Sequence, residues 1–176
     1  NSQLAAMQLL LDYDADINLQ SDQLWTPPHC ATRNGRAQSV GWLLDHGAKA
    51  DDPAHLGQTA LHIAAEQNYR VTLALLLAAG ADANLARSNG ETPLMTAARV
   101  GNVDVVRRLV AAGADPNATE ATLGQTALML AVAENHTPVA RVLLAVGATV
   151  SARSTNRFTA LLFSAQQGNV DAARLL

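Results

Sequence analysis

The chain has 176 residues, a formal net charge of −3 at pH 7, 49% hydrophobic residues and only 3% aromatic residues. With this weak negative charge and no basic stripe, we expect no nucleic-acid binding. No apolar run approaches the roughly 20 residues of a membrane span, so we expect no membrane insertion. The single cysteine, Cys30, excludes an internal disulfide and fits a reducing, cytoplasmic compartment.

The first predicted element is a helix at about residues 4–11, within a segment 1–18 that contains only the second half of a structural unit. Five threonines, one at the start of each later unit's first helix, then recur at intervals of 33 or 34 residues: Thr26, Thr59, Thr92, Thr126 and Thr159. The motifs that begin there are TPPHCA, TALHIA, TPLMTA, TALMLA and TALLFS. This period divides the chain into residues 19–51, 52–84, 85–117, 118–151 and an incomplete 152–176. We predict one repeat domain over residues 1–176. Because the chain starts and ends within a repeat, we expect it to be a fragment of a longer chain.

The repeat 85–117 shows the pattern of one unit. Asn89-Gly90 signals a turn, and Thr92 can cap a helix that begins with Pro93. Gly101-Asn102 separates this helix from a second one, which Gly113 ends. Two helices of about ten residues cannot bury a core alone, so each unit must pack against its copies.

Some repeats depart from this pattern. In 19–51, Leu24 replaces the turn glycine and Gly41 lies inside the second helix. These departures have two alternative explanations, which are sequence drift and a site reshaped for a partner. The repeat 118–151 has one extra residue, which we place in its hairpin tip. In the last repeat Arg157 stands at the turn-glycine position, so we expect an altered backbone there. In 52–84 we expect Val71, Leu75 and Leu76 to form the apolar face of the second helix.

The period, the T-P-L-H-x-A motif and the recurring GAD-x-N segment resemble the ankyrin repeat family over the whole chain. The resemblance implies an all-α repeat solenoid of helix-turn-helix units with β-hairpin loops, in an L-shaped stack. It also implies that His29 and His62 make structural hydrogen bonds, and that Asp82, Asp115, Asn18, Asn84 and Asn117 bond to backbone instead of holding a metal ion.

The resemblance places partner contacts at positions that vary between repeats: the residues around the turn glycine and those near the end of the first helix. In this chain the predicted partner-binding residues are Asp22, Gln23, Trp25, Arg33, Asn34, His55, Leu56, Gln58, Glu66, Gln67, Ser88, Asn89, Glu91, Arg99, Val100, Thr122, Leu123, Gln125, Glu134, Asn156, Phe158 and Gln166. Trp25 and Phe158 hold equivalent positions. Each ring is either an interface hot spot or a side chain folded back over its own hairpin.

The sequence contains no nucleophile–base motif, no metal-ligand spacing and no phosphate-binding loop, so we expect no catalysis, cofactor or metal. We predict a monomeric scaffold that binds a partner protein through a concave groove and the hairpin tips. The alternative is a non-catalytic regulatory or targeting segment of a larger enzyme or channel.

Overall fold

The computed structural model describes residues 2–176, so Asn1, the first residue of the predicted half repeat, lies outside the described residues. The chain forms two compact units, one ending at Asp82 (unit 1) and one spanning Ala83–Leu176 (unit 2). Residues 2–176 contain eleven α-helices, one short 3-10 helix and no β-strand. None of these helices has the length and apolar character needed to cross a membrane.

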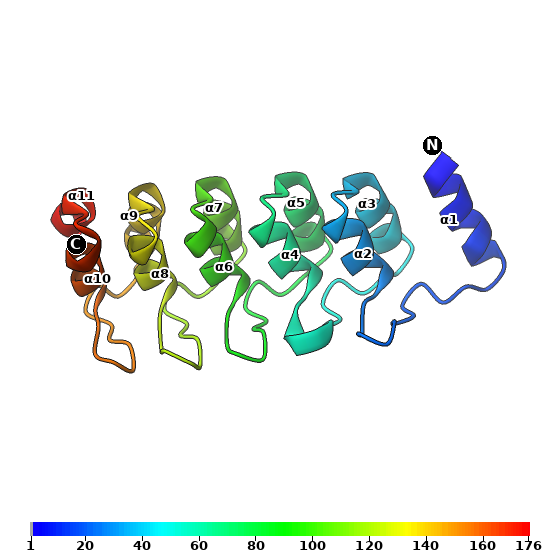
Figure 1. Cartoon of the computed structure of the whole chain (residues 1–176). Coiled ribbons are helices and arrows are strands. Elements are labelled where there is room, and N and C mark those ends of the chain that lie inside the picture. Colours follow the sequence, from blue (N-terminus) through cyan, green and yellow to red (C-terminus); the bar gives the residue numbers. More distant parts are fainter. Residues whose placement is uncertain (1) are drawn as a thin grey trace. The chain divides into compact units, whose positions relative to one another are not determined.

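Unit 1 contains one single helix followed by two helix pairs. These are α1 (Ser2–Asp12), the pair α2 (Pro27–Arg33) and α3 (Ala37–Asp45), the 3-10 helix η1 (His55–Gly57), and the pair α4 (Ala60–Glu66) and α5 (Arg70–Ala78). The position of α1 confirms the helix expected at residues 4–11. The first helices of the two pairs, α2 and α4, pack against each other, and the second helices α3 and α5 do the same. The unit therefore has two helical layers (Figure 1).

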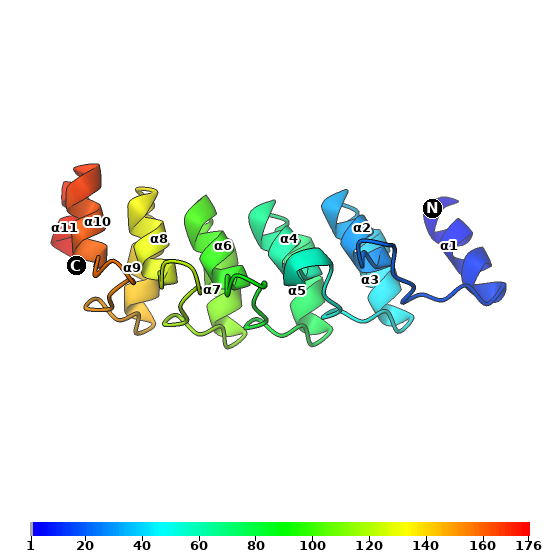
Figure 2. The same ribbon diagram turned by 60° about the horizontal axis from the view of Figure 1, so that its bottom comes forward.

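Unit 2 repeats this arrangement three times. Its pairs are α6 (Pro93–Val100) and α7 (Val103–Ala111), α8 (Ala127–Ala133) and α9 (Thr137–Ala145), and α10 (Ala160–Gln167) and α11 (Val170–Leu175). Helix α8 packs between α6 and α10, and α9 packs between α7 and α11. In each unit, the two helices of a pair lie side by side in both ribbon views, and the long loops project from the same side of the helices (Figures 1 and 2).

The recurring threonines begin the first helices as predicted. All five have extended backbone angles and precede the first helical residue. In unit 2 the hydroxyls of Thr92, Thr126 and Thr159 accept hydrogen bonds from backbone N–H groups three residues later, at 3.3–3.4 Å. Each hydroxyl thus satisfies one of the N–H groups that a helix start leaves without a partner.

Glycine ends the second helices for a conformational reason. Gly47, Gly80, Gly113 and Gly147 have φ between 88° and 91°, and nothing lies within 4 Å of where a Cβ would stand. Glycine is therefore favoured at these positions by the left-handed backbone conformation, and not by a lack of room for a side chain. The alanine after each glycine donates its N–H to a carbonyl five residues back, for example Ala114 to Leu109 at 3.0 Å, which closes the helix as in a Schellman motif.

Asparagine and aspartate side chains tie each repeat to the next one. Asn84 Oδ1 accepts from the N–H of Asp115 at 2.8 Å, and its Nδ2 donates to the carbonyl of Gly113 at 2.9 Å. Asn117 makes the equivalent bonds to Thr149 and Gly147. The expected bonding to backbone is therefore confirmed for these asparagines, and the bonded backbone belongs to the following repeat.

The core consists of leucine, valine, alanine and methionine between the two layers. In α6 and α7 it includes Leu94, Ala97 and Leu109, all fully buried. The expectation for α5 holds only in part, because Leu76 is fully buried whereas Leu75 is half-buried and Val71 is 66% exposed. The apolar face of α5 therefore centres on Leu73 and Leu76.

The loops are hairpin-like turns without strands. Their only bridge within residues 2–176 joins Thr119 and Thr126. The expectation of an altered backbone at Arg157 is wrong, because Arg157 has φ 62° and keeps the left-handed conformation of Gly90 and Gly124. Leu24 does the same with φ 61°. In these two tips a side chain takes a conformation that favours glycine, at a cost of roughly 1 kcal/mol.

Candidate partner-binding surface

The predicted partner-binding residues lie on the loop tips and at the ends of the first helices; we call this set the hairpin surface. Trp25, Gln58 and Gln125 are half-buried, and Glu91 is buried. All the others are exposed: Asp22, Gln23, Arg33, Asn34, His55, Leu56, Glu66, Gln67, Ser88, Asn89, Arg99, Val100, Thr122, Leu123, Glu134, Asn156, Phe158 and Gln166.

In unit 1 the structure brings five of these residues together around one hollow of about 650 Å³. The hollow lies between the first loop tip and the end of α2. Its lining consists of Ser21, Asp22, Gln23, Trp25, Cys30, Arg33 and Asn34. Ser21 and the exposed Cys30 were missed by sequence reasoning, which considered only the positions that vary around the turn.

The two equivalent aromatic rings fold back towards the helix that follows them. The ring of Trp25 lies edge-on to His29 with centroids 5.7 Å apart, and the Arg33 guanidinium lies 5.1 Å from the Trp25 ring centre. Phe158 packs against Phe163 at 5.2 Å and remains 36% exposed. Each ring therefore has an internal partner and still presents part of its surface to solvent.

A cluster of charged side chains on the hairpin surface surrounds Glu91 in unit 2. Its Oε1 accepts hydrogen bonds from Thr96 Oγ1 at 3.0 Å and from Arg99 Nη2, and its Oε2 lies 3.4 Å from Arg87 Nη1. Burial raises the pKa of Glu91, but these donors and charges outweigh it and hold the pKa below its ordinary value. The carboxylate is thus ionised at neutral pH and fixes the half-exposed Arg99 on the surface.

Neighbouring loop tips are joined through their backbones. In unit 1 the N–H of His55 donates to the carbonyl of Gln23 at 3.1 Å. In unit 2 Ala121 donates to Asn89, and Thr155 donates to Leu123, both at 2.8 Å. Within each unit these bonds fix the tips relative to one another, so the side chains on them are presented in a defined order.

The extra residue of repeat 118–151 lies in its loop tip, as expected. The turn there spans Glu120–Gln125, one residue more than the turn Arg87–Glu91 of the preceding repeat. The Glu120 carboxylate fills the wider turn by accepting from the N–H groups of Thr122, Leu123 and Gln125 at 2.6–3.0 Å. Burial raises the pKa of Glu120, but these three backbone donors outweigh it and lower the pKa. The donors are backbone groups, so no sequence signal marked this role.

His29 links its own cap to the following repeat. Its Nδ1 lies 2.7 Å from Thr26 Oγ1 and accepts from the N–H of Thr26 at 3.3 Å. Because Nδ1 accepts, the proton belongs on Nε2, which donates to the carbonyl of Gln58 at 3.0 Å. Burial lowers the pKa of His29. The structural role expected for this histidine is confirmed.

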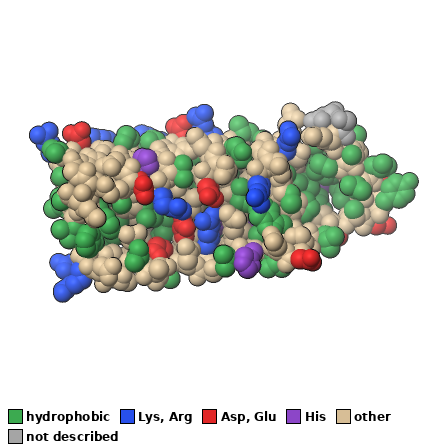
Figure 3. Space-filling view, in the orientation of Figure 1, with side chains coloured by type: hydrophobic (Ala, Val, Ile, Leu, Met, Phe, Trp, Pro, Cys, Tyr) green, Lys and Arg blue, Asp and Glu red, His purple; other side chains and the backbone are tan. Residues whose placement is uncertain are grey.

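The hairpin surface carries charged, polar and apolar side chains. In residues 2–176 no group of three or more His, Cys, Asp or Glu side chains is arranged to hold a metal ion. On the face drawn in Figure 3, acidic and basic side chains are interspersed with neutral ones. Such a surface offers hydrogen bonds and local charge pairs to another macromolecule.

The comparison with known families agrees with this architecture. The profile described as "Ankyrin repeats (3 copies)" matches residues 1–87, 52–120, 70–154 and 94–176. The chain belongs to the ankyrin repeat family. A search of curated proteins gives no match. Ankyrin repeats are generally protein–protein interaction modules and typically have no catalytic activity.

Proposed function

We propose that this chain binds a partner protein through the hairpin surface and the groove beside it, as a scaffold and without catalysis. The observation that carries the proposal is the contrast between fixed frame and varied surface. Caps, glycine stops and asparagine ties recur from repeat to repeat. The side chains on the linked loop tips vary more between repeats, although Leu56 recurs as Leu123 and Gln58 as Gln125, and apart from Glu91 they are not buried. A preformed frame loses little entropy on binding, so affinity is decided by these side chains.

Two regions of the surface are the best candidates for strong contacts. In unit 1 the Trp25–Arg33 pair borders a hollow that can receive a side chain. This favours the interpretation that repeat 19–51 is specialised for a partner. In unit 2 Arg99 is held in place by a buried carboxylate, and Leu123 is 42% exposed on the neighbouring tip. Tryptophan and arginine are the residue types most enriched at interface hot spots.

The test is affinity capture from an extract, analysed by mass spectrometry, with the parent chain and two variants. The first variant carries Trp25→Ala, Arg99→Ala, Leu123→Ala and Phe158→Ala. The control carries Val71→Ala, Arg108→Ala, Val150→Ala and Val170→Ala, which are exposed residues outside the predicted set.

We expect a partner protein that binds the parent and the control but not the first variant. A partner lost only from the control would place binding elsewhere and would contradict the proposal.

A further inference from the structure

The second helices of unit 2 carry an arginine that those of unit 1 lack. Arg107, Arg141 and Arg174 each occupy the fifth position of their helix, α7, α9 and α11. The equivalent residues of α3 and α5 are Gly41 and Ala74. Because α9 packs against both α7 and α11, the three arginines form one row across unit 2. We call it the arginine row.

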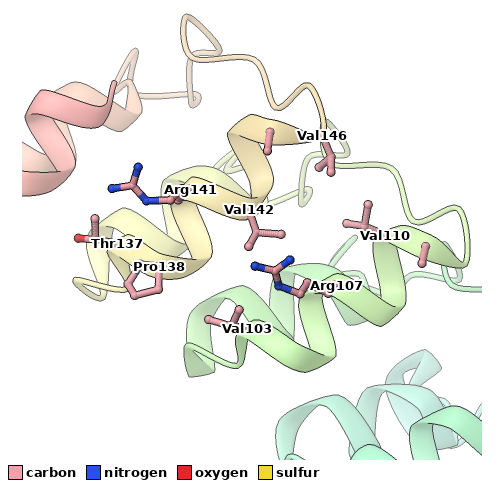
Figure 4. A pocket seen from close by; sticks show the side chains of 10 residues that line it. Val103, Arg107, Val110, Thr137, Pro138, Arg141, Val142 and Val146 are labelled. Atoms are coloured by element: carbon pink, nitrogen blue, oxygen red, sulfur yellow. The ribbon is translucent and has the colours of Figure 1, made fainter.

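Two members of the arginine row, Arg107 and Arg141, border an apolar hollow. The hollow lies between α7 and α9, has a volume of about 720 Å³ and is lined mainly by valine, alanine and proline. In Figure 4, Arg107 extends from α7 into the space in front of Val142, whereas Arg141 points from α9 towards the opposite side. Val103 and Val110 line the α7 side. The site thus offers an apolar recess beside the separate positive charges of the arginine row.

The charges of the row are not neutralised within the described chain. All three arginines are exposed, and no carboxylate in residues 2–176 forms an ion pair with any of them. Arg99, by contrast, is paired with Glu91. Three unpaired guanidinium groups at one repeat position are complementary to an anionic partner.

We propose that the arginine row and the α7/α9 hollow bind an acidic amphipathic helix of a partner protein. Packed helices lie about 8–10 Å apart, which sets the spacing of the row. Carboxylates seven residues apart on a helix are separated by about 10.5 Å and match it. An apolar side chain between them enters the hollow against Val142. The site is separate from the hairpin surface and does not depend on its function.

The apolar hollow favours a protein partner over a nucleic acid. A nucleic acid would engage the guanidinium groups through phosphates and leave the valines of the hollow unused. An amphipathic helix uses both the charges and the recess.

The experiment measures binding of a fluorescein-labelled helical peptide that has glutamates seven residues apart and leucines between them. Two further probes are the same peptide with lysines replacing the glutamates and a single-stranded oligonucleotide.

The test variant carries Arg107→Ala, Arg141→Ala and Arg174→Ala. The matched control carries Arg108→Ala, Arg153→Ala and Arg157→Ala, three other exposed arginines of unit 2, so both variants change the net charge equally. A third variant, Val142→Ser, tests the hollow. Circular dichroism checks that all are folded.

We expect the acidic peptide to bind the parent and to bind the test variant roughly tenfold more weakly. Its affinity for the control variant should differ from that for the parent by less than about twofold. Val142→Ser weakens binding, and added salt weakens it in the parent. The proposal is overturned if the parent does not bind the acidic peptide, if the lysine peptide binds as well, or if both arginine variants lose equal affinity. Oligonucleotide binding that depends on the row and exceeds peptide binding would assign the row to nucleic acid instead.

Discussion

The two units build the same helix pair with different residues at the same positions. At the third position of the first helix, unit 1 has His29 and His62, whereas unit 2 has Met95 and Met129 in its first two pairs. His29 connects its cap to the next repeat by hydrogen bonds. The buried methionines fill the equivalent space with apolar volume. The repeat frame therefore tolerates either a polar link or apolar packing at this site.

The units also differ in where they carry charge. The second helices of unit 1 have no charged residue at the position of the arginine row, and the corresponding hollow between α3 and α5 is bordered by Asp45. The difference indicates that the frame is common to both units, while their surfaces can serve different contacts.

The largest expected effect tests whether the two units unfold separately. Leu109→Ala in unit 2 and Leu76→Ala in unit 1 each remove a fully buried side chain, and each should lower the free energy of unfolding by about 2–5 kcal/mol. Both tryptophans, Trp25 and Trp42, lie in unit 1, so their fluorescence reports on that unit alone. In denaturant titrations, we expect the circular dichroism transition of Leu109→Ala to precede its fluorescence transition, and the reverse order for Leu76→Ala. Coincident transitions in both variants would mean that the units unfold as one.

The half-buried Leu75 supplies the matched control. Leu75→Ala should lower the free energy of unfolding less than Leu76→Ala does.

The second prediction concerns the charge cluster around Glu91 in unit 2. Glu91→Ala leaves two arginines without their carboxylate and should lower the free energy of unfolding by about 1–3 kcal/mol. The exposed Glu134→Ala is the control and should have little effect. Because the folded pKa of Glu91 is lowered, its contribution is present above its ordinary pKa of 4.5 and is lost as the pH falls through the folded pKa. A parent and Glu91→Ala that lose stability in parallel below pH 4.5 would contradict this assignment.

The third prediction distinguishes unit 1, where His29 bonds to the helix cap, from unit 2, where Met95 and Met129 stand at the equivalent position. Burial lowers the pKa of His29 in the folded chain, so the unfolded chain binds the proton first as the pH falls below about 6.5. Stability present above pH 6.5 is therefore lost below it. We expect the melting temperature followed by tryptophan fluorescence to decrease between pH 7.5 and 5.5, and His29→Met to reduce that decrease. An unchanged pH dependence in His29→Met would exclude His29 as its source.

The smallest expected effect compares two loop tips of unit 2. Arg157 already has φ 62°, so Arg157→Gly should stabilise the chain by about 0.5 kcal/mol in thermal melts. Gly90 differs, because an added Cβ would lie 2.8 Å from the backbone nitrogen of Ala121. Gly90→Ala should therefore destabilise the chain more than Arg157→Gly stabilises it. Equal and opposite effects would show that φ alone, and not the neighbouring tip, requires glycine at position 90.

The sequence determined the repeated local structure of this protein. The threonine caps, the glycine stops and the period were all readable because each depends on short-range backbone chemistry. The same reasoning located the extra residue in the tip of repeat 118–151, since an insertion there disturbs no packed helix.

Only the tertiary structure decided how individual side chains are used. Glu91 occupies a position that is solvent-exposed or half-buried in other repeats. It is buried here because Arg87 from the other side of the loop turn and Thr96 and Arg99 from α6 converge on its carboxylate. Leu75 and Leu76 are adjacent leucines in one helix, and packing against neighbouring helices buries one more deeply than the other. The arginine row likewise becomes a surface only when α7, α9 and α11 pack side by side. The physical reason is common to all three cases: local sequence fixes backbone conformation, whereas burial and charge pairing depend on residues that lie near in space through the packing of the repeats.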